Sequence, residues 1–367
     1  MAGTPQVQDA SDKCNVPPQV SYAVYLFDSE RLVRVAKEVN GNSEDVNQHS
    51  IDDTLGFDLL TSPLMPDQEH KLRLFLVRRL HKGAIYTGTG NFSGMDFSLS
   101  ENAIAPSPAI CYYILLPCQH STTLQAMICL LASTETNLEV FRPELTQFCE
   151  MLAAHIPCVK EKPLPVSASA RLMTWYSICV QYVGRVLRAL GSNISSLLQL
   201  AQRSGHIVGG VGVDQMLVDD TERFLEACAM SECLPPAQSP TGEVTTLQKT
   251  DRQTYVVEDV ECNAYCSEWT RHLLDLGHNS EPWRLRRVLE AFKLKTIKDM
   301  NMLKRLLKQS EMDHYSLYRA YSFLWQSGNS DVLLRQAKLE GTSAPDIIAA
   351  LEEHFRYIGA ECAPATV

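Results

Sequence analysis

The strongest helical pattern in the chain runs from Trp283 to Trp325: WRLRRVLEAFKLKTIKDMNMLKRLLKQSEMDHYSLYRAYSFLW. Its apolar residues recur at the spacing of one helix face. They are Leu285, Val288, Leu289, Phe292, Met300, Leu303, Leu306 and Leu307. Pro282 precedes the first turn, where a missing N–H costs little. Burying these side chains would contribute roughly 12–24 kcal/mol before entropy costs, at about 1.5–3 kcal/mol each. We therefore expect a scaffold helix of a helical domain.

The polar side of this helix is basic. Between Trp283 and Gln309 the acidic residues are Glu290 and Asp299 alone, in a chain whose formal net charge is −10. Such a face is either a solvated helix exterior or a docking surface for an acidic partner or anionic lipid head groups. The residues of this candidate partner-binding surface are Arg286, Arg287, Lys298, Lys304, Arg305 and Lys308.

Length and composition limit the class of protein. The chain has 367 residues, 45% of them hydrophobic, which is enough for two domains. Its overall acidity disfavours general nucleic-acid binding, which depends on neutralising phosphates. Its 12 cysteines are scattered among apolar neighbours, as is typical of buried thiols in an intracellular protein. The first residues lack a signal-peptide pattern, and no apolar run is long enough for a transmembrane segment. We expect a cytoplasmic protein that partners recruit to membranes.

The first part of the chain predicts an α+β domain over residues 19–158, after a disordered tail at 1–18. Tyr22–Phe27 is apolar on both faces and predicts a strand that returns at Leu32–Val35 as a hairpin. Residues 37–65 are acidic and polar, which indicates either a solvated loop or a short docking motif. Further strands are expected at 84–86, 95–99, 110–116 and 124–131, with helices at 66–81 and 142–156. This order predicts an antiparallel sheet covered by helices, as in longin-type and GAF-type domains.

A charged, proline-containing linker at 159–168 separates this domain from an all-helical domain at 169–360. A segment rich in Pro, Gln, Ser and Thr predicts a mobile loop at about 234–258. The expected helices span 172–190, 195–202, 214–230, 264–276, 282–308, 313–326, 330–339 and 344–358.

The chain shows no catalytic, cofactor or metal motif. Gly88–Gly94 has one residue too many for a GxGxxG loop, so it predicts a turn, and Gly205–Gly212 predicts a flexible connection between helices. Cys111, Cys118 and His120, or Cys262 and Cys266, do not form the paired CxxC pattern of a zinc site. His314 is expected to cap or pack its helix rather than act as a base.

Several blocks of the sequence resemble the Njmu-R-one family of vertebrate proteins. They are LRLFLVRRLHKGAIYTGTGN (72–91), LEVFRPEL (138–145) and, within 266–334, VLEAFKLKTIKDMNMLKR, QSEMDHYSLY and SGNSDVLL. The resemblance implies a non-enzymatic adaptor subunit that joins a WD-repeat protein and a large scaffold protein at the trans-Golgi network. That complex is associated with the capture of endosome-derived vesicles by golgins. The resemblance transfers no catalytic or partner-binding residue.

Two other functions are compatible with the residues alone. A longin-like sheet would suit a subunit of a small-GTPase regulator, which would accelerate nucleotide exchange. The basic helix face would suit nucleic acid, although the overall acidity of the chain disfavours it.

Overall fold

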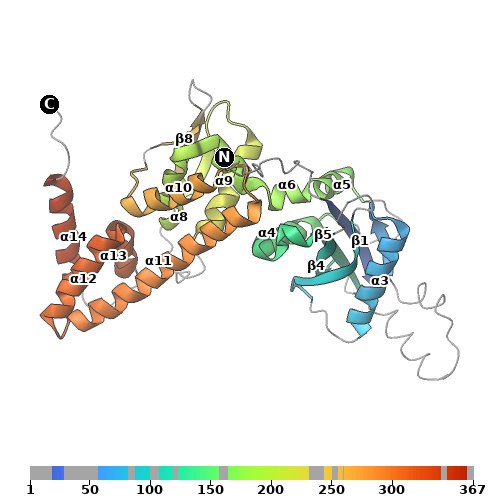
Figure 1. Ribbon diagram of the computed structural model, residues 1–367, viewed down its shortest axis with the longest axis horizontal. Coiled ribbons are helices and arrows are strands. Elements are labelled where there is room, and N and C mark those ends of the chain that lie inside the picture. The colour runs from blue at the N-terminus through green and yellow to red at the C-terminus, as the bar shows by residue number, and fades with distance from the viewer. Residues whose placement is uncertain are drawn as a thin grey trace, which may run out of the picture. The chain divides into compact units, whose positions relative to one another are not determined.

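The structure, a computed structural model, describes residues 19–28, 57–81, 87–99, 107–118, 123–156, 164–230, 244–249, 255–258, 260–339 and 345–361. The chain divides into two compact units, Met1–Thr174 and Trp175–Val367 (Figure 1). The predicted linker at 159–168 lies shortly before this division. Its last residues belong to helix α5 (Val166–Met173), and residues 157–163 lie outside the described ranges.

The first unit contains a five-stranded sheet with the order β2-β1-β5-β4-β3, in which every pair of neighbours is antiparallel. The prediction of an α+β fold with an N-terminal antiparallel sheet is therefore confirmed. The strands are β1 (Val20–Asp28), β2 (Phe57–Thr61), β3 (Asn91–Ser98), β4 (Pro108–Pro117) and β5 (Leu124–Ser133).

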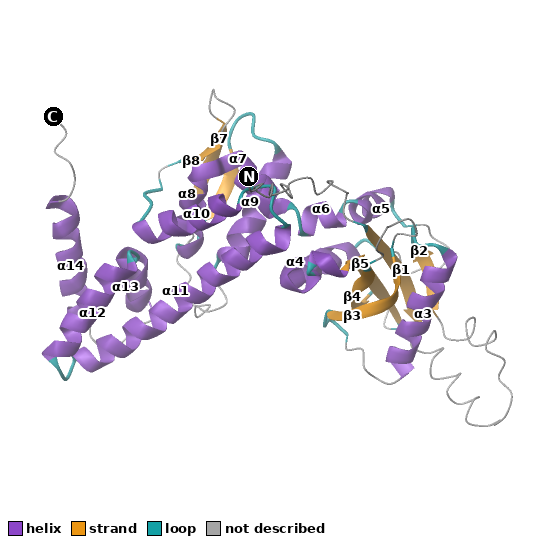
Figure 2. Cartoon of the chain, in the orientation of Figure 1, coloured by secondary structure: helices purple, strands orange, loops and turns teal. Residues whose placement is uncertain are grey.

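Helices cover both faces of this sheet (Figure 2). Leu72 and Leu76 of α3 (Pro66–His81) pack into one core cluster with Cys111 and Tyr113 of β4. The next side chain, Tyr112, points to the opposite face, since side chains alternate along a strand. There its hydroxyl lies 2.8 Å from that of Thr146 in α4 (Arg142–Ala153). The unbroken apolar runs of β4 and β5 follow from this burial on both faces.

One prediction in this unit is wrong. Phe57–Thr61 is strand β2 rather than part of a solvated loop or docking motif, and it pairs with β1. The ring of Phe57 is buried and lies 5.4 Å from that of Phe27 in β1, which gives the short strand its anchor. The predicted tail at 1–18, the returning strand at Leu32–Val35 and the strand at 84–86 lie outside the described residues.

The second unit is largely helical. The predicted helix at 172–190 is divided into the end of α5, which belongs to the first unit, and α6 (Trp175–Cys179) and α7 (Tyr182–Leu190) of the second. The remaining helices confirm the predicted ones to within a few residues at each end. They are α8 (Ile194–Gln202), α9 (Gln215–Cys228), α10 (Ala264–Leu276), α11 (Pro282–Ser310), α12 (His314–Ser327), α13 (Ser330–Leu339) and α14 (Pro345–Glu361).

A small sheet in this unit corrects the expectation of an all-helical domain. Strand β7 (Val244–Lys249) pairs in parallel with β6 (His206–Gly209) and antiparallel with β8 (Tyr255–Val257). The segment predicted as a mobile loop at 234–258 thus contributes two strands. The glycine-rich stretch predicted as a helix connection contributes the third. Gly210 donates its N–H to the Leu247 carbonyl at 2.9 Å, and an added Cβ would lie 2.9 Å from that same oxygen.

Helix α11 runs through two packed regions, as its apolar stripe predicts. In its first half, the ring of Phe292 lies against those of Tyr265 and Trp269 in α10, with centroids 5.5 and 5.9 Å apart. Its second half forms a core with α12, α13 and α14. The buried members of the predicted stripe are Leu285, Leu289, Phe292, Met300, Leu303, Leu306 and Leu307, and Val288 is half-buried.

Candidate partner-binding surface

The six basic residues proposed for partner binding do not share one surface. The inclusion of Arg286 in the predicted partner-binding surface is wrong, because only 4% of this residue is exposed. It follows Leu285 and precedes Leu289 by one turn, so it lies at the edge of the buried stripe. Its Nη1 lies 3.6 Å from a carboxylate oxygen of Glu290. Burial makes Arg286 a structural residue of α11.

Lys304 does not lie on the exposed outer surface of α11 either. It is half-buried and lines a narrow crevice with Leu333 and Gln336 of α13. The sequence could not separate Lys304 from its exposed neighbours, because the position of α13 beside α11 comes from tertiary packing.

Three of the remaining cations form a line along the outside of α11. Arg287, Lys298 and Arg305 are all exposed and are separated by 11 and 7 residues. At 3.6 residues per turn these intervals return to nearly the same side, and the line is about 27 Å long at about 1.5 Å per residue. The Arg287 guanidinium lies 4.9 Å from the ring centre of Trp283, which holds the first cation of the line in place.

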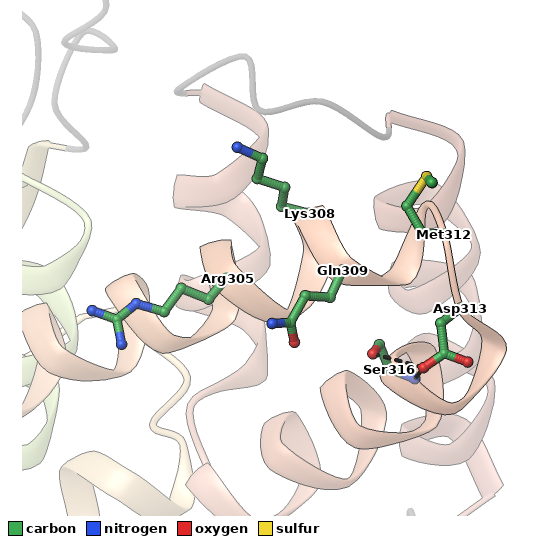
Figure 3. Close-up of a pocket in the computed structure, with 6 residues that line it drawn as sticks. All are labelled: Arg305, Lys308, Gln309, Met312, Asp313 and Ser316. Carbon is green, nitrogen blue, oxygen red and sulfur yellow. Dashed lines mark hydrogen bonds between the residues drawn. The ribbon is translucent and has the colours of Figure 1, made fainter.

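Arg305 and Lys308 also line a pocket of about 530 Å³ at the turn between α11 and α12. Gln309 and Met312 come from the end of α11 and the turn, and Asp313 and Ser316 from the start of α12 (Figure 3). In the figure both cations extend from α11 away from the bonded Asp313–Ser316 pair. Among the described residues, neither cation has an ion-pair partner.

The Asp313 carboxylate in this pocket is engaged as the N-cap of α12. It accepts hydrogen bonds from the backbone N–H groups of Tyr315 at 3.0 Å and Ser316 at 3.2 Å. The Ser316 hydroxyl donates a third at 3.0 Å. The pKa of Asp313 is lowered chiefly by the Tyr315 N–H bond, because these donors favour the ionised form. The predicted cap at His314 therefore lies one residue too late, although Asp just before a helical pattern was a readable signal.

The other candidate sites show structural roles in the described residues. Cys111, Cys118 and Cys266 are buried, and burial raises the pKa of Cys266. In the described part of the chain no three His, Cys, Asp or Glu side chains gather to hold a metal, and His120 lies outside it. Gly88 has φ +77° at a turn, but the turn predicted over Gly88–Gly94 is too long, because β3 begins at Asn91 and includes Gly94. Within the described ranges, no helix has the length and apolarity needed to cross a membrane.

Hydrogen bonds among polar side chains, of which Gln199 and Asn329 are buried, fix α13 against the start of α10. The Asn263 side-chain oxygen accepts a hydrogen bond from the Cys266 N–H and so caps α10. The nitrogen of the same amide donates to the side-chain oxygens of Asn329 at 2.7 Å and Asp331 at 3.0 Å. The Gln199 amide donates to the other Asp331 oxygen at 3.0 Å. Sequence patterns did not indicate this network, because its members lie up to 132 residues apart.

Comparisons with known proteins agree with the family blocks. The model of the Njmu-R1-like protein family matches residues 22–357. The chain is also similar to Protein Njmu-R1 of Mus musculus, with 27% identity in an alignment of length 365 that covers 91% of this chain and 90% of the mouse protein. Since the family model extends over far more than half of the sequence, this chain belongs to the Njmu-R1-like protein family.

Proposed function

We propose that this protein is a non-enzymatic adaptor subunit of a complex that captures endosome-derived vesicles at the trans-Golgi network. It acts by protein–protein contacts with a WD-repeat protein and a large scaffold protein, and reaches golgins through them. It works on the cytoplasmic side, peripheral to the trans-Golgi network or to the vesicles. It needs no cofactor and binds no nucleic acid.

The line of Arg287, Lys298 and Arg305 is the observation that carries this proposal. Three exposed cations on one side of a helix that is anchored on its other side form a rigid, positively charged strip. Such a strip is suited to meet an acidic surface, where charge sets the association rate and the choice of partner. It also lies in the block of sequence that most resembles the family.

Recovery of the complex from cells tests the proposal. The tagged full-length chain is purified under mild conditions, and its partners are identified by mass spectrometry. We expect a WD-repeat protein and a large scaffold protein of the trans-Golgi network. Their absence from repeated purifications would rule out this function.

A triple charge reversal tests the strip itself. Arg287→Glu, Lys298→Glu and Arg305→Glu together should leave the unfolding midpoint nearly unchanged, since all three side chains are exposed. Partner recovery should fall about tenfold or more, because opposite charges at an interface become like charges. The matched control reverses Arg188, Lys249 and Arg271, exposed cations elsewhere in the same unit. Equal recovery with both variants would mean that the strip is only solvated.

A longin-type subunit of a small-GTPase regulator is the second candidate. It is favoured by the order of the described elements from β1 to α4, which are two strands, a helix, three strands and a helix. The measurement is nucleotide exchange by a panel of trafficking GTPases, with the purified chain alone and with its partners. A rate equal to the intrinsic one for every GTPase would eliminate this candidate.

A further inference from the structure

Helix α12 has an exposed aromatic face that the sequence pattern did not reveal. Tyr315, Tyr318 and Trp325 expose 66%, 64% and 55% of their surface, and Met312 in the preceding turn exposes 90%. The three aromatic residues are spaced by three and seven residues, so they follow one side of the helix. Large apolar side chains gathered on one surface in this way mark interaction sites more often than single exposed ones.

The face is held rigidly by the packing behind it. Ala320 and Leu324, on the opposite side of α12, are fully buried in the core with α11 and α13. Trp325 lies at one margin, where its ring stacks on Phe355 of α14 at 6.4 Å between centroids. A face that needs no rearrangement loses little conformational entropy on binding.

The other margin of the face is positively charged. Arg319, four residues after Tyr315, is exposed beside Ser316, which lines the pocket with Arg305 and Lys308. Among the described residues Arg319 has no ion-pair partner either. The acidic residues between 305 and 326 are Glu311 and Asp313, and the Asp313 carboxylate is held by its three cap hydrogen bonds. The positive charges of Arg305, Lys308 and Arg319 are therefore not neutralised by acidic side chains of the described residues.

We propose that this α12 face, defined by Met312, Tyr315, Tyr318, Arg319 and Trp325, binds an amphipathic helix of a partner protein. The apolar stripe of that helix covers the aromatic residues, and acidic residues beside the stripe meet Arg319, Arg305 and Lys308. Tyr, Trp and Arg are the residue types that dominate binding energy at interfaces, and anchors one and two turns apart are typical of helix recognition. The inference rests on the proposed adaptor function, for which it names the class of partner segment.

A synthetic helix tests the recognition chemistry directly. The probe is a fluorescein-labelled, hydrocarbon-stapled peptide of about 15 residues, which matches α12 in length. It carries Leu along one side and Glu on both flanks, and a second peptide carries Lys in place of every Glu. Fluorescence anisotropy with the full-length chain should show that the Glu peptide binds at least about tenfold more tightly than the Lys peptide.

Two variants locate the binding. Tyr315→Ser with Tyr318→Ser, and separately Lys308→Glu with Arg319→Glu, should each weaken binding of the Glu peptide about tenfold or more. The control is Val211→Ser with Met216→Ser, which removes two exposed apolar side chains elsewhere in the unit. Circular dichroism and the unfolding midpoint verify that every variant is folded. Equal binding of both peptides, or binding that neither variant weakens, overturns the proposal.

Other occupants of the face give distinct results. Sedimentation with phosphatidylserine vesicles tests an anionic membrane, and sedimentation velocity tests a second copy of this chain. Vesicle binding or self-association that is lost in the Tyr315→Ser, Tyr318→Ser variant, without binding of the Glu peptide, overturns the partner helix in favour of that occupant.

A photo-cross-linking experiment in cells separates this inference from the proposed function. The cross-linking amino acid p-benzoylphenylalanine replaces Tyr318, or Val211 as control, in the full-length chain. We expect a cross-link from position 318 alone to an acidic, helix-forming segment of a co-purifying subunit, identified by mass spectrometry. An intact complex without that cross-link overturns the α12 face and leaves the adaptor function standing. If no complex is recovered, the adaptor function fails, and the peptide measurement alone decides the α12 face.

Discussion

Arg286 and Arg287 are neighbours in sequence, yet the structure gives them opposite roles. One helical step rotates the side chain by about 100°, which takes Arg286 into the edge of the core and leaves Arg287 in solvent beside Trp283. A basic residue within an amphipathic helix is therefore not automatically part of a basic surface. The distinction decides which cations are available to a partner.

Charge reversal should separate the two arginines by stability. Arg286→Glu places a second carboxylate beside Glu290 at a buried site and should lower the free energy of unfolding by about 3 kcal/mol or more. Arg287→Glu loses only an exposed cation–π contact and should cost less than about 1 kcal/mol. Urea unfolding followed by tryptophan fluorescence measures both, because all four tryptophans lie between residues 175 and 325. A cost for Arg287→Glu as large as that for Arg286→Glu would contradict the burial.

At the scale of elements, the small sheet of the second unit depends on close backbone approach. Strands β6 and β7 pair in parallel although 34 residues separate their ends, and the segment between them includes α9. The Ile207 N–H donates its hydrogen bond to the Glu222 carboxylate of α9 at 2.7 Å. Gly210 then brings the chain against the Leu247 carbonyl. The sheet is thus held by α9 and by a glycine rather than by long strands.

Gly210→Ala should therefore loosen β6 from β7. The added Cβ would lie 2.9 Å from a backbone oxygen that cannot move aside cheaply, and such overpacking costs about 1–3 kcal/mol. Hydrogen exchange of the amides in β6 and β7 should become faster while exchange in α12 and α13 stays unchanged. Gly94→Ala in β3 is the control, since a Cβ there meets nothing within 4 Å. Unchanged protection in β6 and β7 would mean that the backbone shifts without loosening the sheet.

At the scale of the whole molecule, buried tyrosines link stability to alkaline pH. Burial raises the pKa of Tyr176 to about 12, and it raises that of Tyr265 as well. The unfolded chain releases the phenolic proton near pH 10, before the folded chain does. The stabilisation is therefore complete below pH 10 and is lost as the pH rises through the folded pKa.

Tyr176→Phe tests this linkage with little change in packing. The free energy of unfolding of the wild-type second unit should fall between about pH 10 and 12. In the variant the free energy of unfolding should fall less steeply with pH. The slope should be smaller by about 1.4 kcal/mol per pH unit, because one fewer proton is released on unfolding. Urea titrations with tryptophan fluorescence at several pH values give the slope. Identical slopes would show that the Tyr176 hydroxyl is not excluded from water.

The sequence alone determined the elements whose signals are local. The apolar stripe of 283–307, the amphipathic pattern of 66–81 and the continuous apolar runs of β4 and β5 predicted long helices and buried strands, because each pattern repeats within its own segment. Gly277 and Gly328 directly follow α10 and α12 and have positive φ, a conformation that glycine adopts without strain at helix ends. The order of these elements was sufficient for the α+β class and for an antiparallel first sheet.

Only the tertiary structure decided the short strands and the surfaces. The five residues of β2 and the four of β6 carry too few alternations to outweigh their polar and glycine-rich surroundings, so contact with β1, β7 and α9 determines them. The same holds for exposure. The heptad-like spacing of Tyr315, Tyr318 and Trp325 would suit a core as well as a surface. Burial of Ala320 and Leu324 on the other side of α12 turned those aromatic rings toward solvent.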